Sequence, residues 1–126
     1  MNSIAYFEIQ ATDPKKAVAF YNTIFGWEFV KEELVPIEYY RTTNCHGISG
    51  AILQRPLETP PMQYGTNAFV CSVQVENYDA TAKLIADNGG IVAMAKFAVP
   101  GRCWQGYFID PDNNTFGLFQ VDDAAK

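Results

Sequence analysis

The sequence is poor in the residues on which several large classes of protein depend. It has one histidine and three cysteines, and its nine Lys and Arg residues, against fourteen Asp and Glu, leave a net charge of −5. Because no basic run would attract a phosphate backbone, we expect no nucleic-acid partner. No segment approaches the roughly 20 apolar residues of a membrane span, and the first residues lack the basic and apolar regions of a secretion signal. These absences predict a cytoplasmic protein with no membrane partner.

The cysteines and the histidine lack the spacing of a metal or nucleophile site. Cys45, Cys71 and Cys103 are far apart and include no Cys-x-x-Cys pair, which argues against a disulfide framework or a zinc site. His46 follows Cys45 directly, but adjacent strand residues point to opposite faces and no third orienting group is evident. We therefore expect His46 to be structural or exposed to solvent. Cys71 falls at a position that faces a predicted helix, which favours a small buried core residue.

The chain does contain ample material for one hydrophobic core. Apolar residues make up 48% of its 126 residues and aromatic residues 14%, which excludes a disordered or fibrous chain. This length is close to that of a typical domain and too short for two independent cores. We expect a single domain over residues 1–126.

A weak internal repeat divides that domain into two halves. A shift of 64 positions aligns Glu8–Gln10 with Ser72–Gln74 and Gly26 with Gly90. Inside the intervening helix it also aligns Ala17 with Thr81 and Phe20 with Leu84. The repeat predicts two modules of the same topology.

The first half has the local signals of strand, helix and three strands. Residues 5–10 alternate with a period of two, which puts Phe7 and Ile9 on one face. Asp13 is a predicted helix N-cap and Pro14 the first helical residue, and Gly26 ends the helix. The apolar stripe of this helix is formed by Ala17, Phe20, Tyr21 and Ile24. Three strands follow, at 27–33, 36–42 and 48–54.

The second half repeats this order after a connector. Residues 55–66, with three prolines and one glycine, have the composition of a linker, so the halves are approximately 1–55 and 66–122. Strand 67–75 precedes helix 79–88, whose predicted apolar side contains Ala82, Ile85 and Ala86. Strands at 91–99, 103–109 and 115–120 follow, and Asp110 with Pro111 starts a tight turn between the last two. The predicted fold is α+β: two βαβββ modules forming curled mixed sheets around a cleft, with the helices outside.

At this point the sequence resembles the glyoxalase/bleomycin resistance protein/extradiol dioxygenase superfamily, also called the vicinal oxygen chelate superfamily, in its glyoxalase-like branch related to lactoylglutathione lyase. Three segments carry the resemblance, which spans nearly the whole chain: Phe7–Trp27 with its Phe-Tyr and Phe-Gly-Trp motifs, Asn88–Gly90, and Phe108–Asn114 with its Asp-Pro-Asp turn. The resemblance implies the two-module fold and a homodimer of paired or exchanged halves.

The same resemblance implies metal-ligand positions on the first and last strands of each half, but this sequence fills them poorly. They correspond to Tyr6, Val70 and Gly117, and to one of Ile52, Leu53 and Gln54. Only Gln54 offers a suitable donor, and a chelating mechanism needs several donors around one ion. We therefore expect no metal and no other cofactor.

Strand alternation selects the residues that face the cleft. Tyr6, Glu8 and Gln10 point away from the helix, as Val70, Ser72 and Gln74 do in the second half. A carboxylate in a partly apolar concavity would have a raised pKa, so Glu8 is the candidate general acid or base. We expect the ligand-binding residues to be Tyr6, Gln54, Ser72, Gln74, Trp104 and Tyr107.

Other side chains could extend this region. Tyr40 and Phe119 could also line an apolar pocket, although core packing explains them equally well. Arg102 and Gln105 could bind an anionic group at its mouth.

These residues favour a metal-independent, small-molecule-binding protein of the bleomycin-resistance type, with its ligand in the cleft between the halves. The alternative is an enzyme, a lyase or isomerase related to lactoylglutathione lyase, in which Glu8 moves a proton. A third possibility is an interaction module whose cleft is filled by its own side chains. Since fold does not fix function, the sequence does not name the ligand.

Overall fold

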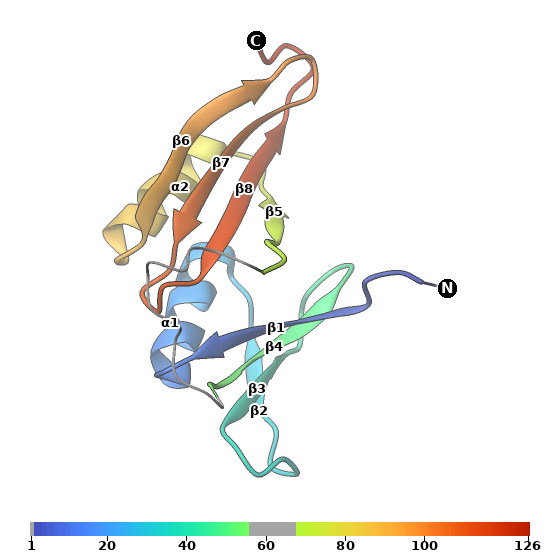
Figure 1. Cartoon of the computed structure of the whole chain (residues 1–126), viewed down its shortest axis with the longest axis vertical. Coiled ribbons are helices and arrows are strands. Elements are labelled where there is room, and N and C mark those ends of the chain that lie inside the picture. Colours follow the sequence, from blue (N-terminus) through green and yellow to red (C-terminus); the bar gives the residue numbers. More distant parts are fainter. Residues whose placement is uncertain (1, 56–67) are drawn as a thin grey trace. The chain divides into compact units, whose positions relative to one another are not determined.

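The computed structural model describes residues 2–55 and 68–126. The described residues fall into two compact units, one on each side of the gap, and each contains one helix and one four-stranded sheet (Figure 1). The predicted linker lies outside the described residues except for Arg55. Among the described residues, no helix has the length and hydropathy needed to cross a membrane.

The first unit is a βαβββ module. Its elements in chain order are β1 Tyr6–Ala11, α1 Pro14–Phe25, β2 Phe29–Lys31, β3 Tyr39–Thr42 and β4 Ser49–Gln54. The sheet, called sheet 1 below, has the strand order β1-β4-β3-β2. Strands β1 and β4 are parallel and the other pairs are antiparallel.

The second unit has the same topology. Its elements are β5 Ser72–Gln74, α2 Tyr78–Asp87, β6 Ile91–Val99, β7 Cys103–Ile109 and β8 Thr115–Val121. Sheet 2 has the order β5-β8-β7-β6, with β5 and β8 parallel. The predicted α+β fold of two βαβββ modules is therefore confirmed. Three strands are shorter than predicted, since 27–33 reduces to β2, 36–42 to β3 and 67–75 to β5.

Local sequence signals set the ends of α1 as predicted. The Asp13 carboxylate accepts a hydrogen bond from the Lys16 backbone N–H at 3.2 Å, and Pro14 is the first helical residue. Gly26 has φ +72° and its N–H donates to the Asn22 carbonyl, which closes the helix. The predicted apolar stripe of α1 is buried.

The face of sheet 1 that α1 covers is aromatic. The Phe7 and Trp27 rings lie 5.6 Å apart, and Tyr21 of α1 stacks on Trp27 at the same distance. Gly50, opposite Phe7 on β4, is required here because an added Cβ would lie 2.5 Å from the Phe7 ring. Phe7 therefore faces the helix, and Tyr6 and Glu8 face the other way, as predicted.

Helix α2 differs from the prediction at its first residue and at one position of its apolar side. It begins at Tyr78, after the N-cap Asn77, and buries Tyr78 and Ile85. Ala86, expected on the apolar side, is exposed. Leu84, which the repeat aligns with buried Phe20, is 42% exposed. The helix starts one residue earlier than predicted, and over two turns its buried stripe runs through Tyr78, half-buried Ala82 and Ile85.

Two further expectations concern the ends of sheet 2. Cys71 was expected in the core, but it is exposed: it directly precedes the three residues of β5, and only its carbonyl is bound to the sheet, accepting from the Gly117 N–H at 2.8 Å among the described residues. The turn before β8 forms as predicted: Asp110 is buried and its carboxylate accepts hydrogen bonds from the N–H groups of Asp112 and Asn114, each at 2.9 Å.

Candidate functional site

The helix-free face of sheet 1 contains a cluster of two phenols and one carboxylate. Tyr39 donates its hydroxyl proton to Oε2 of Glu8 at 2.9 Å, and the hydroxyls of Tyr39 and Tyr6 are 2.9 Å apart. Register explains the meeting, since Glu8 lies opposite Ala51 on β4 and Tyr39 lies opposite Leu53, two residues further along. We call Tyr6, Tyr39 and Glu8 the phenol–carboxylate cluster.

The cluster is open to solvent at Tyr6 and Glu8. Tyr6 is 45% exposed, and Glu8 is also exposed rather than enclosed in an apolar concavity. Burial, the hydrogen bonds to Tyr6 and Glu8, and the charge of Glu8 together raise the pKa of Tyr39 well above its ordinary value. The Tyr39 phenol therefore keeps its proton and acts as a hydrogen-bond donor to Glu8.

Sequence reasoning missed Tyr39. It considered Tyr40, which lies opposite Ile52 on the helix-bearing face and donates to Glu38 at 3.2 Å. Alternation along β3 puts Tyr39 and Arg41 together on the other face. The signal was present in the sequence, but using it requires knowing that β3 pairs with β4 and in which register.

The helix-free face of sheet 2 has a neutral pair at corresponding positions. Gln105 donates to the Ser72 hydroxyl at 3.3 Å, next to Gly117. Tyr107, opposite Gly117, is half-buried on the same face, and its ring stacks on Phe97 with centroids 6.5 Å apart. Ser72 and Tyr107, two of the predicted binding residues, are therefore brought to one face.

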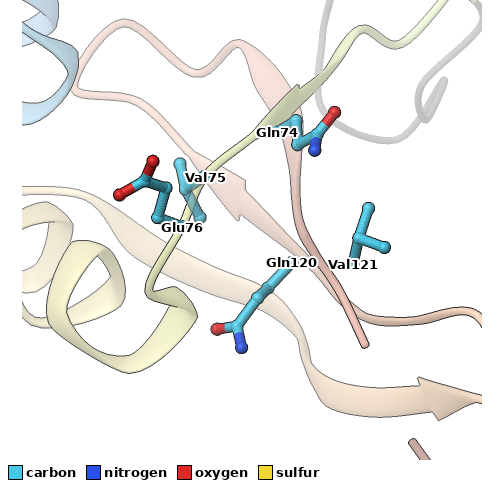
Figure 2. Close-up of a pocket in the computed structure, with 5 residues that line it drawn as sticks. All are labelled: Gln74, Val75, Glu76, Gln120 and Val121. Carbon is cyan, nitrogen blue, oxygen red and sulfur yellow. The ribbon is translucent and has the colours of Figure 1, made fainter. Parts of the chain in front are cut away.

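A groove of about 440 Å³ lies at the carboxyl ends of the parallel strands β5 and β8. It is lined by Gln74, Val75, Glu76, Gln120 and Val121 (Figure 2). The polar groups do not converge, because the Gln74 amide and the Glu76 carboxylate lie on opposite sides of the chain in Figure 2. The Gln120 amide oxygen is occupied by the Tyr78 backbone N–H at 2.7 Å. Predicted binding residue Gln74 thus lines an open groove without a focused set of polar groups.

Two predicted binding residues lie elsewhere. Trp104 is on the face of β7 that bears Phe108 and Gly106, where its Nε1 donates to Asp122 at 3.0 Å. The Lys96 ammonium lies 4.8 Å from the Trp104 ring centroid and also bonds Asp79 of α2 at 3.1 Å. The Gln54 amide donates to the Thr12 carbonyl at 3.3 Å, on the helix-bearing side of sheet 1. His46, as expected, is exposed.

The positions at which the resemblance implies metal ligands do not fit a divalent ion. Gly117 has no side chain, and an added Cβ would overlap the Ser72 hydroxyl and lie 3.0 Å from the Gln105 amide nitrogen. Val70 offers no donor and Gln54 bonds the backbone. Among residues 2–55 and 68–126, no group of three or more His, Cys, Asp and Glu side chains could hold a metal ion.

Comparisons with known proteins agree with this fold. A family model described as Glyoxalase/Bleomycin resistance protein/Dioxygenase superfamily matches residues 3–118. None of the curated proteins compared with the chain matches it.

Solved structures with the same fold have little sequence identity to the chain. A family enzyme from Burkholderia phytofirmans PsJN is 17% identical with a TM-score of 0.72, covering 94% of this chain and 98% of that one. The fosfomycin resistance protein FosX from Listeria monocytogenes is 18% identical with a TM-score of 0.74, covering 100% and 93%. A glyoxalase I mutant from Zea mays is 15% identical with a TM-score of 0.68, covering 92% and 45%. With its two βαβββ modules and a family model that spans both, the chain belongs to the glyoxalase/bleomycin resistance protein/dioxygenase superfamily.

Proposed function

We propose that this protein binds a small organic molecule without a metal ion, in the manner of the bleomycin-resistance members of its family. The observation that carries the proposal is the phenol–carboxylate cluster, since it gathers polar and aromatic groups on an exposed sheet face. A cluster of this kind combines ring surface with directed hydrogen bonding, which is the usual composition of a ligand site. The absence of suitable donors at Val70 and Gly117 supports the metal-independent part of the proposal.

Ligand-induced stabilisation tests this function. Protein stripped with a chelator is heated with a library of metabolites and antibiotics, and a bound ligand raises the melting temperature because it binds the folded state only. At a ligand concentration 100 times the Kd, binding raises the free energy of unfolding by about 2.7 kcal/mol. We expect hits whose shift is the same after soaking with Zn²⁺, Ni²⁺ or Mn²⁺. No hit in the library, or hits only with metal, would contradict the proposal.

The second candidate function is a lyase or isomerase reaction in which Glu8 moves a proton. It is favoured by one observation: only Oε2 of Glu8 accepts a hydrogen bond from the described residues, so Oε1 is available to a substrate. Turnover of the methylglyoxal–glutathione hemithioacetal tests it. Activity that Glu8→Gln abolishes and Glu33→Gln preserves would favour the enzyme over the binding protein.

We also propose that the protein is a homodimer that pairs through β6. Among the described residues this strand is at the edge of sheet 2 and pairs with β7 alone, and its apolar side chains Ile91, Val92 and Met94 are 62%, 55% and 54% exposed. An edge strand of this kind presents unpaired backbone groups to a partner. Its one charged residue, Lys96, is bound to Asp79, so a second copy would meet no like charge there despite the net charge of −5.

The molar mass of the protein, measured by light scattering as it elutes from a size-exclusion column at a range of concentrations, tests the dimer. We expect a dimer for the native chain and a monomer for the double variant Ile91→Lys and Met94→Lys. The control is Leu34→Lys, which adds charge at a residue that is 93% exposed in the first unit. A native chain that is monomeric throughout, or a double variant that remains dimeric, would overturn the proposal.

A further inference from the structure

The direction of the hydrogen bonds in the phenol–carboxylate cluster is fixed. Tyr39 donates to Oε2 of Glu8, and a phenol has only one proton to give. At its second contact Tyr39 must therefore accept, so Tyr6 donates to it over the 2.9 Å between their oxygens. The order is Tyr6 to Tyr39 to Glu8, and both phenol protons are used inside the cluster.

The cluster consequently offers a ligand hydrogen-bond acceptors and no donors. Oε1 of Glu8 accepts no hydrogen bond from the described residues, and the lone pairs of the Tyr6 oxygen also remain. Both are acceptors, and the exposed ring of Tyr6 presents a π face that attracts cations. Glutamate is ordinarily anionic at neutral pH. Every outward-facing group of the cluster therefore favours a ligand that is positively charged and donates hydrogen bonds.

Arg41, a basic residue of the same face, does not compete for Glu8. Arg41 lies in register with Glu8 through Ala51, two strand spacings or roughly 10 Å away. Its guanidinium Nε is 3.6 Å from the Glu32 carboxylate. Among residues 2–55 and 68–126, Glu8 takes part in no ion pair. The Glu8 charge is available to a bound molecule.

We infer that the ligand class of this face is an organic cation with N–H donors, an amine or guanidine attached to an apolar group. The inference rests on the proposed function and specifies its ligand. The N–H groups bond Oε1 of Glu8 and the Tyr6 oxygen, and the apolar group lies against the Tyr6 ring.

Four probes that share a phenyl ring separate charge from hydrogen bonding: benzylammonium, benzyltrimethylammonium, benzyl alcohol and benzoate. Binding to the full chain is measured by ligand-observed NMR and by calorimetry. We expect affinity to fall in that order, with benzylammonium at least tenfold tighter than benzyl alcohol. Equal or tighter binding of benzyl alcohol or benzoate would overturn the inference while leaving the proposed function intact. A library without any hit would instead remove the proposed function.

Variants locate the site on the molecule. Glu8→Gln should weaken benzylammonium at least tenfold, whereas Glu33→Gln, which changes the net charge equally, should not. Tyr6→Phe keeps the ring and removes the acceptor, so it should weaken benzylammonium several-fold and leave benzyltrimethylammonium unchanged. Because Glu8 and Tyr6 are exposed, their substitution should leave the fold intact. The melting temperature of each variant serves as the folding control. Loss of binding in Glu76→Gln but not Glu8→Gln would assign cations to the groove of sheet 2 and overturn the inference.

Discussion

On the helix-free face of each sheet, one side-chain hydrogen bond joins the same two positions of the module. The donor and acceptor groups differ between the two sheets. In sheet 1 the acceptor Glu8 is on the first strand of the module, and the donor Tyr39 is on the third, displaced by two residues in register. In sheet 2 the acceptor Ser72 and the donor Gln105 have the same relation, because Ser72 lies opposite Gly117 and Gln105 opposite Phe119.

This comparison separates what the backbone repeats from what the side chains decide. The βαβββ topology brings the same two positions together in each module. The side chains make one pair anionic and aromatic and the other neutral. Chemical selectivity therefore belongs to a few positions that the fold merely juxtaposes.

The largest expected effect tests the equivalence of the two helices. Phe20, 4% exposed in α1, aligns with Leu84, 42% exposed in α2. We expect Phe20→Ala to lower the free energy of unfolding by about 3–5 kcal/mol through a core cavity. Leu84→Ala should change it by no more than about 0.5 kcal/mol. Urea denaturation of both variants measures the difference, and similar losses would mean that the helices are packed alike.

A second prediction contrasts glycines on the two faces of sheet 2. A Cβ on Gly106 would overlap the hydroxyl of buried Tyr78 and lie 3.3 Å from the Met94 carbonyl. We expect Gly106→Ala to cost about 1–3 kcal/mol by overpacking. Gly117→Ala meets the hydroxyl of exposed Ser72, which can rotate away, so its cost should be smaller. Thermal unfolding ranks the two, and the reverse order would contradict the burial argument.

A third prediction uses the raised pKa of Tyr39 to distinguish the Tyr39–Glu8 hydrogen bond of sheet 1 from the Gln105–Ser72 hydrogen bond of sheet 2. The folded chain holds the phenol proton more tightly than the unfolded chain, so the stability gained is present below the ordinary tyrosine pKa of about 10. It is lost as the pH rises above that value. The stability difference between the native chain and Tyr39→Phe should shrink from pH 9 to pH 11. Gln105→Leu, which removes a neutral donor, should show no comparable trend over that range.

The smallest predicted effect concerns the end of sheet 2. Hydrogen bonds from the Ala124 N–H and from Trp104 lower the pKa of the Asp122 carboxyl. Its contribution to stability is therefore present above the ordinary aspartate pKa of about 3.9 and is lost as the pH falls through the lower folded value. Asp122→Asn should be less stable than the native chain at pH 7 and approach it below pH 4. Chemical denaturation measures the difference in the free energy of unfolding between the two proteins. A difference that stays constant from pH 7 to below pH 4 would contradict this role of the Asp122 carboxylate.

The sequence predicted what depends on local signals. Asp13 and Gly26 mark the ends of α1 in any tertiary context, and the Asp110 turn is held by its own side chain. It failed where a position depends on phase or register. Ala86 was placed on the apolar side of α2 but is exposed, and Cys71 was placed in the core because β5 was taken as longer than its three residues.

The candidate site was predicted in part for the same reason. Alternation along β1 correctly put Tyr6 and Glu8 on the helix-free face, since that pattern is local. Their partner Tyr39 comes from β3, which reaches them only through β4. Trp104 was assigned by chemical type rather than by face, and β7 alternation puts it on the side of Phe108. Which chemical groups meet on a sheet depends on pairings between distant segments.

The tight contact at Gly117 also constrains how this chain could change over evolutionary time. A metal ligand at this position would need a side chain, but any Cβ here meets the Ser72 hydroxyl. A mutation to His or Glu would therefore require the exposed Ser72 hydroxyl to rotate away, or Ser72 itself to become smaller. The order of these two substitutions matters, and because Val70 also offers no donor, a metal site would require further substitutions beyond this pair.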